Sequence, residues 1–272
     1  MISIITTFHN SEKFLDANIR SVRLIHHQDK IEHILVDDGS TDTSQKIVKS
    51  YSSKNLMLIS AGRLGRAKSL NLAIKHSKYK YICILDSDDL INPYWVDYFI
   101  ENNKSICKIS NNASIFFGNA DIINGNFSEI PHPRKDSKKV VYYKFPSWKI
   151  FFFNPIPHLG VMIEKNLFGA KRLYNDNRGS QLDWDLWFRS IMKKREFVKI
   201  NITTGSKRIH PNQFFEKKRH TKYTISGILL QVYWSFRLKK ILLPLVIIVG
   251  SIRLLWSIVP SKYRVKLHEK LS

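Results

Sequence analysis

The segment Tyr81-Ile-Cys-Ile-Leu-Asp-Ser-Asp-Asp-Leu90 decides the fold, because a short apolar run ends in three carboxylates within four residues, Asp86, Asp88 and Asp89. Apolar residues on both faces predict a buried, parallel strand. The carboxyl end of such a strand is where an open α/β sheet places its ligand. Clustered carboxylates repel one another unless a cation or hydrogen-bond donors compensate them. This segment alone fits a divalent metal that holds a phosphate, and it equally fits a polar turn with helix-capping aspartates.

Predicted strands and helices alternate on both sides of this segment. We expect strands at 2–7, 31–36, 56–60, 81–85 and 114–118, separated by helices at about 11–25, 43–51, 67–74 and 93–102. This alternation predicts an α/β fold with a mostly parallel central sheet and helices on both faces. A Gly-x-Gly-x-x-Gly segment after the first strand and a Walker A lysine loop are both absent from the sequence, which argues against a dinucleotide-binding or P-loop protein.

Composition and charge limit the function classes. The 272 residues are 43% hydrophobic, which suits a globular core, and the two cysteines, Cys83 and Cys107, provide no disulfide framework. The sequence does not open with the basic and then apolar segments of a secretory signal peptide, so we expect a cytoplasmic protein. The 44 Lys and Arg residues against 22 Asp and Glu give a net charge of +22, which attracts nucleic acid, anionic lipid or phosphorylated substrates.

The second half of the chain changes in character. Residues 125–149 are basic and contain three prolines, and the segment 182–189 predicts a helix with Asp183 in its first turn. We expect a nucleotide-sugar-binding half at 1–124, an acceptor and catalytic-base half at 125–222, and a helical tail at 223–272.

The tail is apolar but is interrupted by Arg237, Lys239, Lys240 and Arg253. A spanning segment over 241–259 would bury Arg253 at a cost of roughly 3 kcal/mol. We therefore expect an interfacial helix pair whose basic residues face lipid headgroups, with a helix packed on the domain as the alternative.

Five motifs carry a family resemblance. They are Ile2–Glu12, Val36–Asp42, Gly65–Asn71, Tyr81–Asp89 and Asp183–Arg189, in this order and spacing over residues 1–210. Together they resemble a family 2 glycosyltransferase of the GT-A fold, of the type that builds bacterial surface polysaccharide. The resemblance implies inverting transfer from a nucleotide-diphospho sugar, with Mg²⁺ or Mn²⁺ as the cofactor.

The same resemblance assigns roles to single positions. Asp183 matches the catalytic base, and Asp86-Ser87-Asp88 matches the D-x-D motif that holds nucleotide and metal, with Asp89 as a supporting carboxylate. The expected nucleotide-binding residues are Thr7, Phe8, Asp37, Asp38, Lys68, Asp86 and Ser87, and the expected metal ligands are Asp86, Asp88 and His210. His158 and Trp184 are the candidates for the acceptor side.

Three positions depart from the family pattern. Thr7 stands where proline is common, and Leu182 stands where the acidic neighbour of the base is common. Leu70 replaces a common arginine, so the phosphate contact falls to Arg63, Arg66 or Lys68.

Structural roles remain open for several of these residues. Asp183 also fits a helix cap, Asp37 a cap of the following turn, and Trp184 a core residue. Asp185 lies two residues beyond Asp183, roughly 200° around a helix, so it should point elsewhere.

We expect a nucleotide-diphospho sugar donor, first of all a UDP-sugar, and a glycan or polyprenyl-linked acceptor for O-antigen, capsule or lipopolysaccharide. The basic tail predicts peripheral binding to an anionic membrane at the inner face of the cytoplasmic membrane. The alternatives are a nucleotidyltransferase and a non-catalytic protein that binds nucleotide sugar or nucleic acid. The ordered acidic motifs disfavour a nucleic-acid partner.

Overall fold

The structure is a computed structural model that describes residues 1–51, 53–124, 139–169, 172–210 and 220–258. The chain forms two compact units. The first comprises Met1–Ser147 and Pro155–Ile209, and the second comprises Trp148–Asn154 and His210–Ser272. The predicted division into donor and acceptor halves concerns function and stays a prediction.

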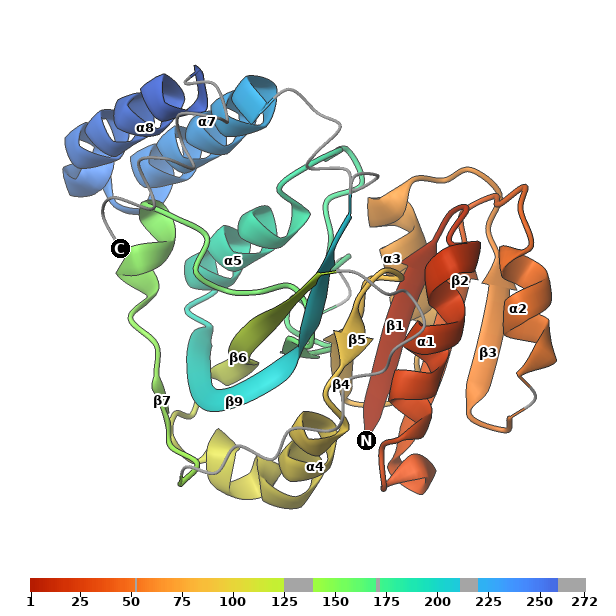
Figure 1. Ribbon diagram of the computed structural model, residues 1–272. Helices are drawn as coiled ribbons and strands as arrows, with labels where there is room; N and C mark the ends of the chain where they lie inside the picture. The colour runs from red at the N-terminus through yellow and green to blue at the C-terminus, as the bar shows by residue number, and fades with distance from the viewer. Residues whose placement is uncertain (52, 125–138, 170–171, 211–219, 259–272) are drawn as a thin grey trace. The chain divides into compact units, whose positions relative to one another are not determined.

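A mixed sheet forms the centre of the first unit, in the order β3-β2-β1-β4-β8-β6-β9-β5, with β7 paired to β9 (Figure 1). The strands are β1 (Ile2–Phe8), β2 (Ile31–Asp37), β3 (Leu56–Ser60), β4 (Tyr81–Ile84), β5 (Leu90–Ile91), β6 (Ala113–Asn124), β7 (Tyr142–Lys144), β8 (Met162–Glu164) and β9 (Glu196–Ile209). Strands β1 to β4 are parallel, as predicted. The other half departs from the prediction, because β8 enters antiparallel between β4 and β6.

Helices cover both faces of this sheet, as predicted. They are α1 (Glu12–Arg23), α2 (Ser44–Ser50), α3 (Arg66–His76), α4 (Pro93–Cys107) and α5 (Leu182–Met192), with the 3₁₀ turn η1 (Gln28–Lys30). A further 3₁₀ turn, η2 (Ser147–Phe151), lies mostly in the second unit. Figure 1 shows α1 in front of the parallel strands and α3 behind them. Helix α4 begins at Pro93 as expected, since the Asn92 side chain caps it by accepting a bond from the Tyr94 amide at 3.2 Å.

The parallel strands are buried in the core and end at one edge of the sheet. Strands β2 and β4 are buried along their whole length. Alternate residues of β1, Ile2 and Ile4, pack with Trp95 and Phe99 of α4 in one apolar cluster of this unit. Because β2 and β4 both pair with β1 in parallel, the acidic segments that follow them lie at the same edge of the sheet.

The second unit consists mainly of α7 (His220–Leu238), η3 (Lys240–Leu242) and α8 (Leu243–Ile258). Within the described residues, one helix is long and apolar enough to cross a membrane by length and composition. Its window is Lys240–Ser257, with a mean hydropathy of 1.8 and 11% of the window buried. Of the basic segment 125–149, residues 125–138 lie outside the described residues, and β7 belongs to the remainder.

The β6–β9 pair depends on Gly118. A Cβ atom at Gly118 would lie 2.0 Å from the carbonyl oxygen of Ile202, beside a register shift between the strands. We predict that Gly118→Ala lowers the free energy of unfolding by about 1–3 kcal/mol or more, since the backbone must shift. Urea unfolding of the full chain measures this. Gly179→Ala is the matched control, because a Cβ there meets nothing within 4 Å. Equal midpoints for the two variants would contradict the close approach.

Candidate active site

The turn after β4 carries the D-x-D motif and is held by its main chain. The amide of Asp89 donates to the Asp86 carbonyl at 3.0 Å. The Asn18 side-chain amide, from α1, donates to the carbonyls of Asp86 and Asp89 at 2.9 and 2.8 Å. From β9, Arg208 Nε donates to the Asp88 carbonyl at 3.0 Å. Two distant elements therefore fix the backbone, and the carboxylates need not supply the turn's own hydrogen bonds.

Asp89 supports this turn from inside. Its side chain is only 4% exposed, and Oδ1 accepts the Arg208 amide at 3.0 Å. Burial, with the nearby charges of Asp88 and Asp86, raises the pKa of Asp89 well above its ordinary value. This position fits the supporting role that the sequence predicted for it.

Asp86 is compensated by a cation from α3. Arg66 NH2 lies 2.5 Å from Asp86 Oδ1. Burial alone would raise the pKa of Asp86, but the positive charge of Arg66 outweighs burial and lowers that pKa. The carboxylate therefore remains ionised at neutral pH. Of the three phosphate-binding candidates left open by the sequence, Arg66 is the one that reaches the D-x-D motif.

A hydrogen-bonded chain continues from Arg66. Its NH2 donates to His158 Nδ1 at 3.2 Å, and His158 Nε2 lies 2.8 Å from the Tyr174 hydroxyl. Because a guanidinium only donates, Nδ1 must accept, so the proton of the neutral imidazole lies on Nε2 and is donated to the Tyr174 oxygen. Burial, reinforced by Arg66, lowers the pKa of His158 and keeps the ring neutral. The Tyr174 hydroxyl proton is left to donate to a further acceptor.

Asp183 belongs to the same group of charges. It is the second residue of α5, where the helix dipole favours a carboxylate. Burial alone would lower the pKa of Arg66, but nearby carboxylates, Asp86 and Asp183 foremost, outweigh it and raise that pKa. Asp185 instead is buried with Arg178 Nε 3.2 Å from its Oδ1, which confirms that it points elsewhere.

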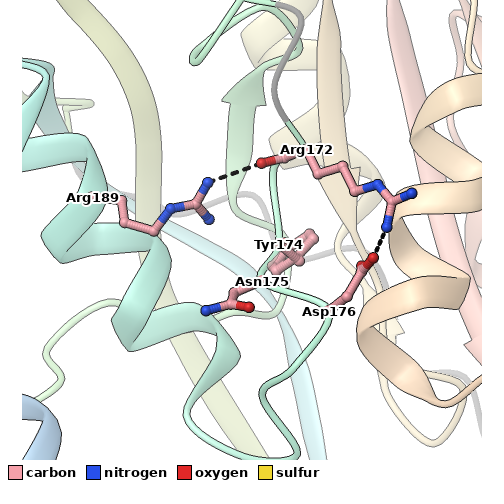
Figure 2. A pocket seen from close by; sticks show the side chains of 5 residues that line it. All are labelled: Arg172, Tyr174, Asn175, Asp176 and Arg189. Carbon is pink, nitrogen blue, oxygen red and sulfur yellow. Dashed lines mark hydrogen bonds and ion pairs between the residues drawn. The ribbon is translucent and has the colours of Figure 1, made fainter.

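The loop that carries Tyr174 is braced on both sides. Asn71 of α3 bonds both the amide and the carbonyl of Tyr174, at 3.0 and 2.8 Å. Beside this loop lies an open pocket of about 400 Å³, shown in Figure 2. Its two guanidinium groups are already engaged, since Arg189 donates to the Arg172 carbonyl and Arg172 pairs with Asp176. Asn71 and Arg189 therefore fix the main chain of the loop and with it Tyr174, a residue that the sequence had not singled out.

Asp38 is the first of the two predicted nucleotide-side carboxylates. Its Oδ1 accepts the amides of Leu64 and Gly65 at 2.8 and 3.0 Å and the Ser69 hydroxyl at 3.0 Å. Gly65 has a φ of 86°, a left-handed conformation that favours glycine. Asp38 thus ties the loop before α3 to the edge of the sheet and fixes the start of α3 at Arg66.

Asp37 is buried and has local partners. Its Oδ1 accepts the Ser40 amide at 2.8 Å, and its Oδ2 accepts the side-chain amide of Gln45. This arrangement is the turn-capping role left open for Asp37, and its nucleotide role stays a prediction.

Two aromatic candidates lie in the core. The Phe8 side chain is 2% exposed and packs with Leu15 and Leu35. Trp184 is 2% exposed and stacks on Phe188. This burial fits the core role left open for Trp184, and the binding roles of both residues stay predictions. Thr7 lies beside Phe8 at the end of β1 and is partly exposed.

Three other predicted residues take separate positions. Ser87 Oγ lies 3.0 Å from Ser11 Oγ, the residue that precedes α1. Lys68 is exposed and lines a different cavity, of about 650 Å³, together with Lys75 and Lys165. His210 belongs to the second unit.

The described residues contain no group of three or more His, Cys, Asp and Glu side chains arranged to hold a metal ion. The donor set of Asp86 and Asp88 nevertheless fits Mg²⁺ or Mn²⁺, since such ions take one or two carboxylates and complete their shell with water and phosphate oxygens.

Solved structures identify the fold class. The chain is similar to the structure of Staphylococcus aureus TarS residues 1–349 in complex with UDP-GlcNAc, with a TM-score of 0.64, 17% identity and coverage of 86% of this chain and 66% of that one. The UDP complex of the same protein gives a TM-score of 0.61 and 18% identity, covering 86% of this chain and 64% of that one. The fold is the predicted GT-A fold.

The family follows from the sequence match. The model of glycosyl transferase family 2 matches residues 3–169, more than half of the 272-residue chain, and the protein belongs to this family. The predicted family and enzyme class are confirmed.

The chain spans less than two thirds of the length of the curated relatives described here. An uncharacterized glycosyltransferase of Methanocaldococcus jannaschii is 29% identical over 71% of this chain and 65% of its own length. The UDP-Glc:alpha-D-GlcNAc-diphosphoundecaprenol beta-1,3-glucosyltransferase WfgD of Escherichia coli is 32% identical over 46% of this chain and 48% of its own. A teichoic acid poly(glycerol phosphate) polymerase of Staphylococcus epidermidis is 24% identical over 73% of this chain and 27% of its own.

Asp89 makes stability depend on pH. Its pKa is raised on folding above the ordinary value of 3.8, so the folded state binds the proton more tightly than the unfolded state does. The free energy of unfolding should therefore fall as pH rises from about 4 through the folded pKa. Asp89→Asn keeps an oxygen for the Arg208 amide but cannot ionise, so this variant should gain stability relative to the parent across that window. Urea unfolding at a series of pH values tests this, and parallel curves for the two proteins would contradict it.

Proposed function

We propose that the protein is an inverting glycosyltransferase that moves a sugar from a nucleotide-diphospho sugar, with UDP as the nucleotide, to a hydroxyl of a glycan or lipid-linked glycan. The observation that carries this proposal is that Arg66 pairs with Asp86 at 2.5 Å and bonds His158 at 3.2 Å, while Asp183 of α5 is, after Asp86, the carboxylate that most raises the pKa of Arg66. The donor and acceptor ends of a transfer reaction need such carboxylates within one site. The UDP-GlcNAc named in the TarS structure and the UDP-Glc named for WfgD support UDP as the nucleotide.

At the donor end, Arg66 changes partners. In the structure its guanidinium neutralises Asp86. When donor binds, Asp86 and Asp88 would hold the divalent ion, which supplies Lewis-acid stabilisation of the leaving nucleoside diphosphate. Arg66 is then free to donate to diphosphate oxygens, where a planar guanidinium makes strong charge-assisted bonds.

At the acceptor end, Asp183 removes the proton from the attacking hydroxyl. A positioned carboxylate base contributes about 10²–10⁴-fold to the rate. Attack from the side opposite the leaving group inverts the anomeric centre. The Tyr174 oxygen accepts from His158, and the charge of Asp183 is one of the causes, after burial, that raise the pKa of Tyr174, so the two groups lie close together.

The relatives and the charge support the proposed acceptor class. WfgD acts, by its name, on a diphosphoundecaprenol-linked sugar, and the Staphylococcus epidermidis relative is named for teichoic acid synthesis. We place this protein in cell-surface polysaccharide synthesis at the cytoplasmic face of the membrane. The net charge of +22 favours an anionic, lipid-linked acceptor there.

A donor screen followed by transfer tests the reaction. The full chain is mixed with Mn²⁺ or Mg²⁺ and a panel of nucleotide sugars, and thermal shift selects the donor. We then predict that Asp183→Asn lowers kcat for transfer to a synthetic polyprenyl-diphosphate sugar by about 10²–10⁴-fold while donor binding stays nearly unchanged. Asp185→Asn is the control on the same helix, since that carboxylate faces Arg178. Normal turnover in Asp183→Asn removes Asp183 as the base.

A second pair of variants tests the diphosphate contact. Arg66→Ala removes the guanidinium beside Asp86 and should weaken UDP binding about tenfold to a hundredfold, the loss expected for charge-assisted hydrogen bonds. Lys68→Ala removes a neighbouring positive charge that lines the other cavity and should change UDP affinity little. Calorimetric titration with UDP measures both. The reverse ranking would return the phosphate role to Lys68.

A further inference from the structure

The helices of the second unit carry a surface that the proposed reaction does not use. Helices α7 and α8 pack on each other, and Gly250 of α8 lies against Ile228 of α7 so closely that a Cβ would be 3.0 Å from it. Buried residues of these helices include Leu230, Trp234 and Val246. A helix of a soluble domain normally turns polar residues to its other side.

Here the exposed sides are apolar as well. Large exposed apolar side chains recur every three or four residues along each helix, which places them on one stripe per helix. The α7 stripe is Ile225, Leu229, Tyr233 and Phe236, and the α8 stripe is Leu245, Ile248, Ile252 and Leu255. Ile241, in the turn between the helices, is 87% exposed. Scattered exposed apolar residues are ordinary, but two continuous stripes mark an interaction surface.

The charge inside the α8 sequence does not interrupt its stripe. Arg253 NH1 donates to Gln231 Oε1 at 2.9 Å and to the Phe152 carbonyl at 3.4 Å. Gln231 in turn donates to the Phe151 carbonyl at 2.6 Å. This corrects the expectation that Arg253 faces lipid headgroups, because its guanidinium is used within the second unit.

Three positive charges lie at the turn between the two helices. Arg237, Lys239 and Lys240 are exposed there. The Arg237 guanidinium lies 5.2 Å from the Tyr233 ring centre, and Lys240 Nζ lies 4.8 Å from that of Phe236. Apolar stripes joined to aromatic and basic residues are complementary to the boundary between acyl chains and anionic headgroups.

We propose that the α7–α8 helix pair binds an anionic bilayer in the plane of the interface, with both stripes among the acyl chains and the turn at the headgroups. The window Lys240–Ser257 has the length of a spanning helix, so length does not separate the two geometries. A spanning helix, however, would carry Arg253 and its polar partners into lipid. This proposal concerns the second unit alone and does not depend on the transfer reaction.

Vesicle binding by the full chain tests the surface. The probes are vesicles of phosphatidylglycerol with phosphatidylcholine, and of phosphatidylcholine alone. We expect Ile248→Ser with Ile252→Ser to lower the bound fraction constant at least about tenfold on the anionic vesicles. Lys239→Gln with Lys240→Gln should reduce binding only to the anionic vesicles. Ile122→Ser with Val141→Ser, two exposed apolar residues of the first unit, is the matched control and should bind as the parent does.

A second measurement does not require a stable apolar variant. Brominated lipid should quench Trp256, which is exposed on α8, and Trp256→Phe should lose that part of the quenching. Alkaline carbonate should release the protein from vesicles. Retention after carbonate would overturn the interfacial geometry in favour of a spanning helix. Undiminished pelleting of Ile248→Ser with Ile252→Ser, or a change in its oligomeric state without lipid, would overturn the lipid surface in favour of a protein contact.

Discussion

Three carboxylates in four residues must be held together, and the first unit is built to meet that constraint. The parallel strands deliver the Asp86–Asp89 turn to the edge of the sheet. Asn18 and Arg208 then fix its carbonyls from opposite ends of the sequence, and Arg66 neutralises Asp86. Folding thus creates the charge compensation before any ligand arrives. The same guanidinium connects the turn to the acceptor side through His158.

The sequence predicted the parallel strands well because both of their faces are buried and their apolar runs are continuous. Strand β8 was missed, since three residues carry no period and its place depends on pairing with β4 and β6. Strand β9 extends over Glu196–Ile209. Its length is set by its partners β5, β6 and β7 rather than by local preference.

The site shows the same division between local and tertiary information. The sequence singled out the D-x-D aspartates and Asp183 because they stand in motifs. Arg66 remained one of three candidates, because spacing alone cannot tell which basic side chain meets a carboxylate from another element. Asn18 had one signal, a polar residue between the apolar positions of α1. Tyr174 had none, because its role depends on contacts with Asn71 and His158 that only the tertiary structure creates.

The way the turn is held bears on how this enzyme can diverge. Asn18 and Arg208 bind carbonyl oxygens, which every amino acid presents alike. A substitution at Ser87 therefore leaves these bonds in place and loses only its hydroxyl contact with Ser11. Mutation can alter the side chains that contact the ligand while the hydrogen bonds that hold the turn are kept. New donor preferences can therefore arise without loss of the fold.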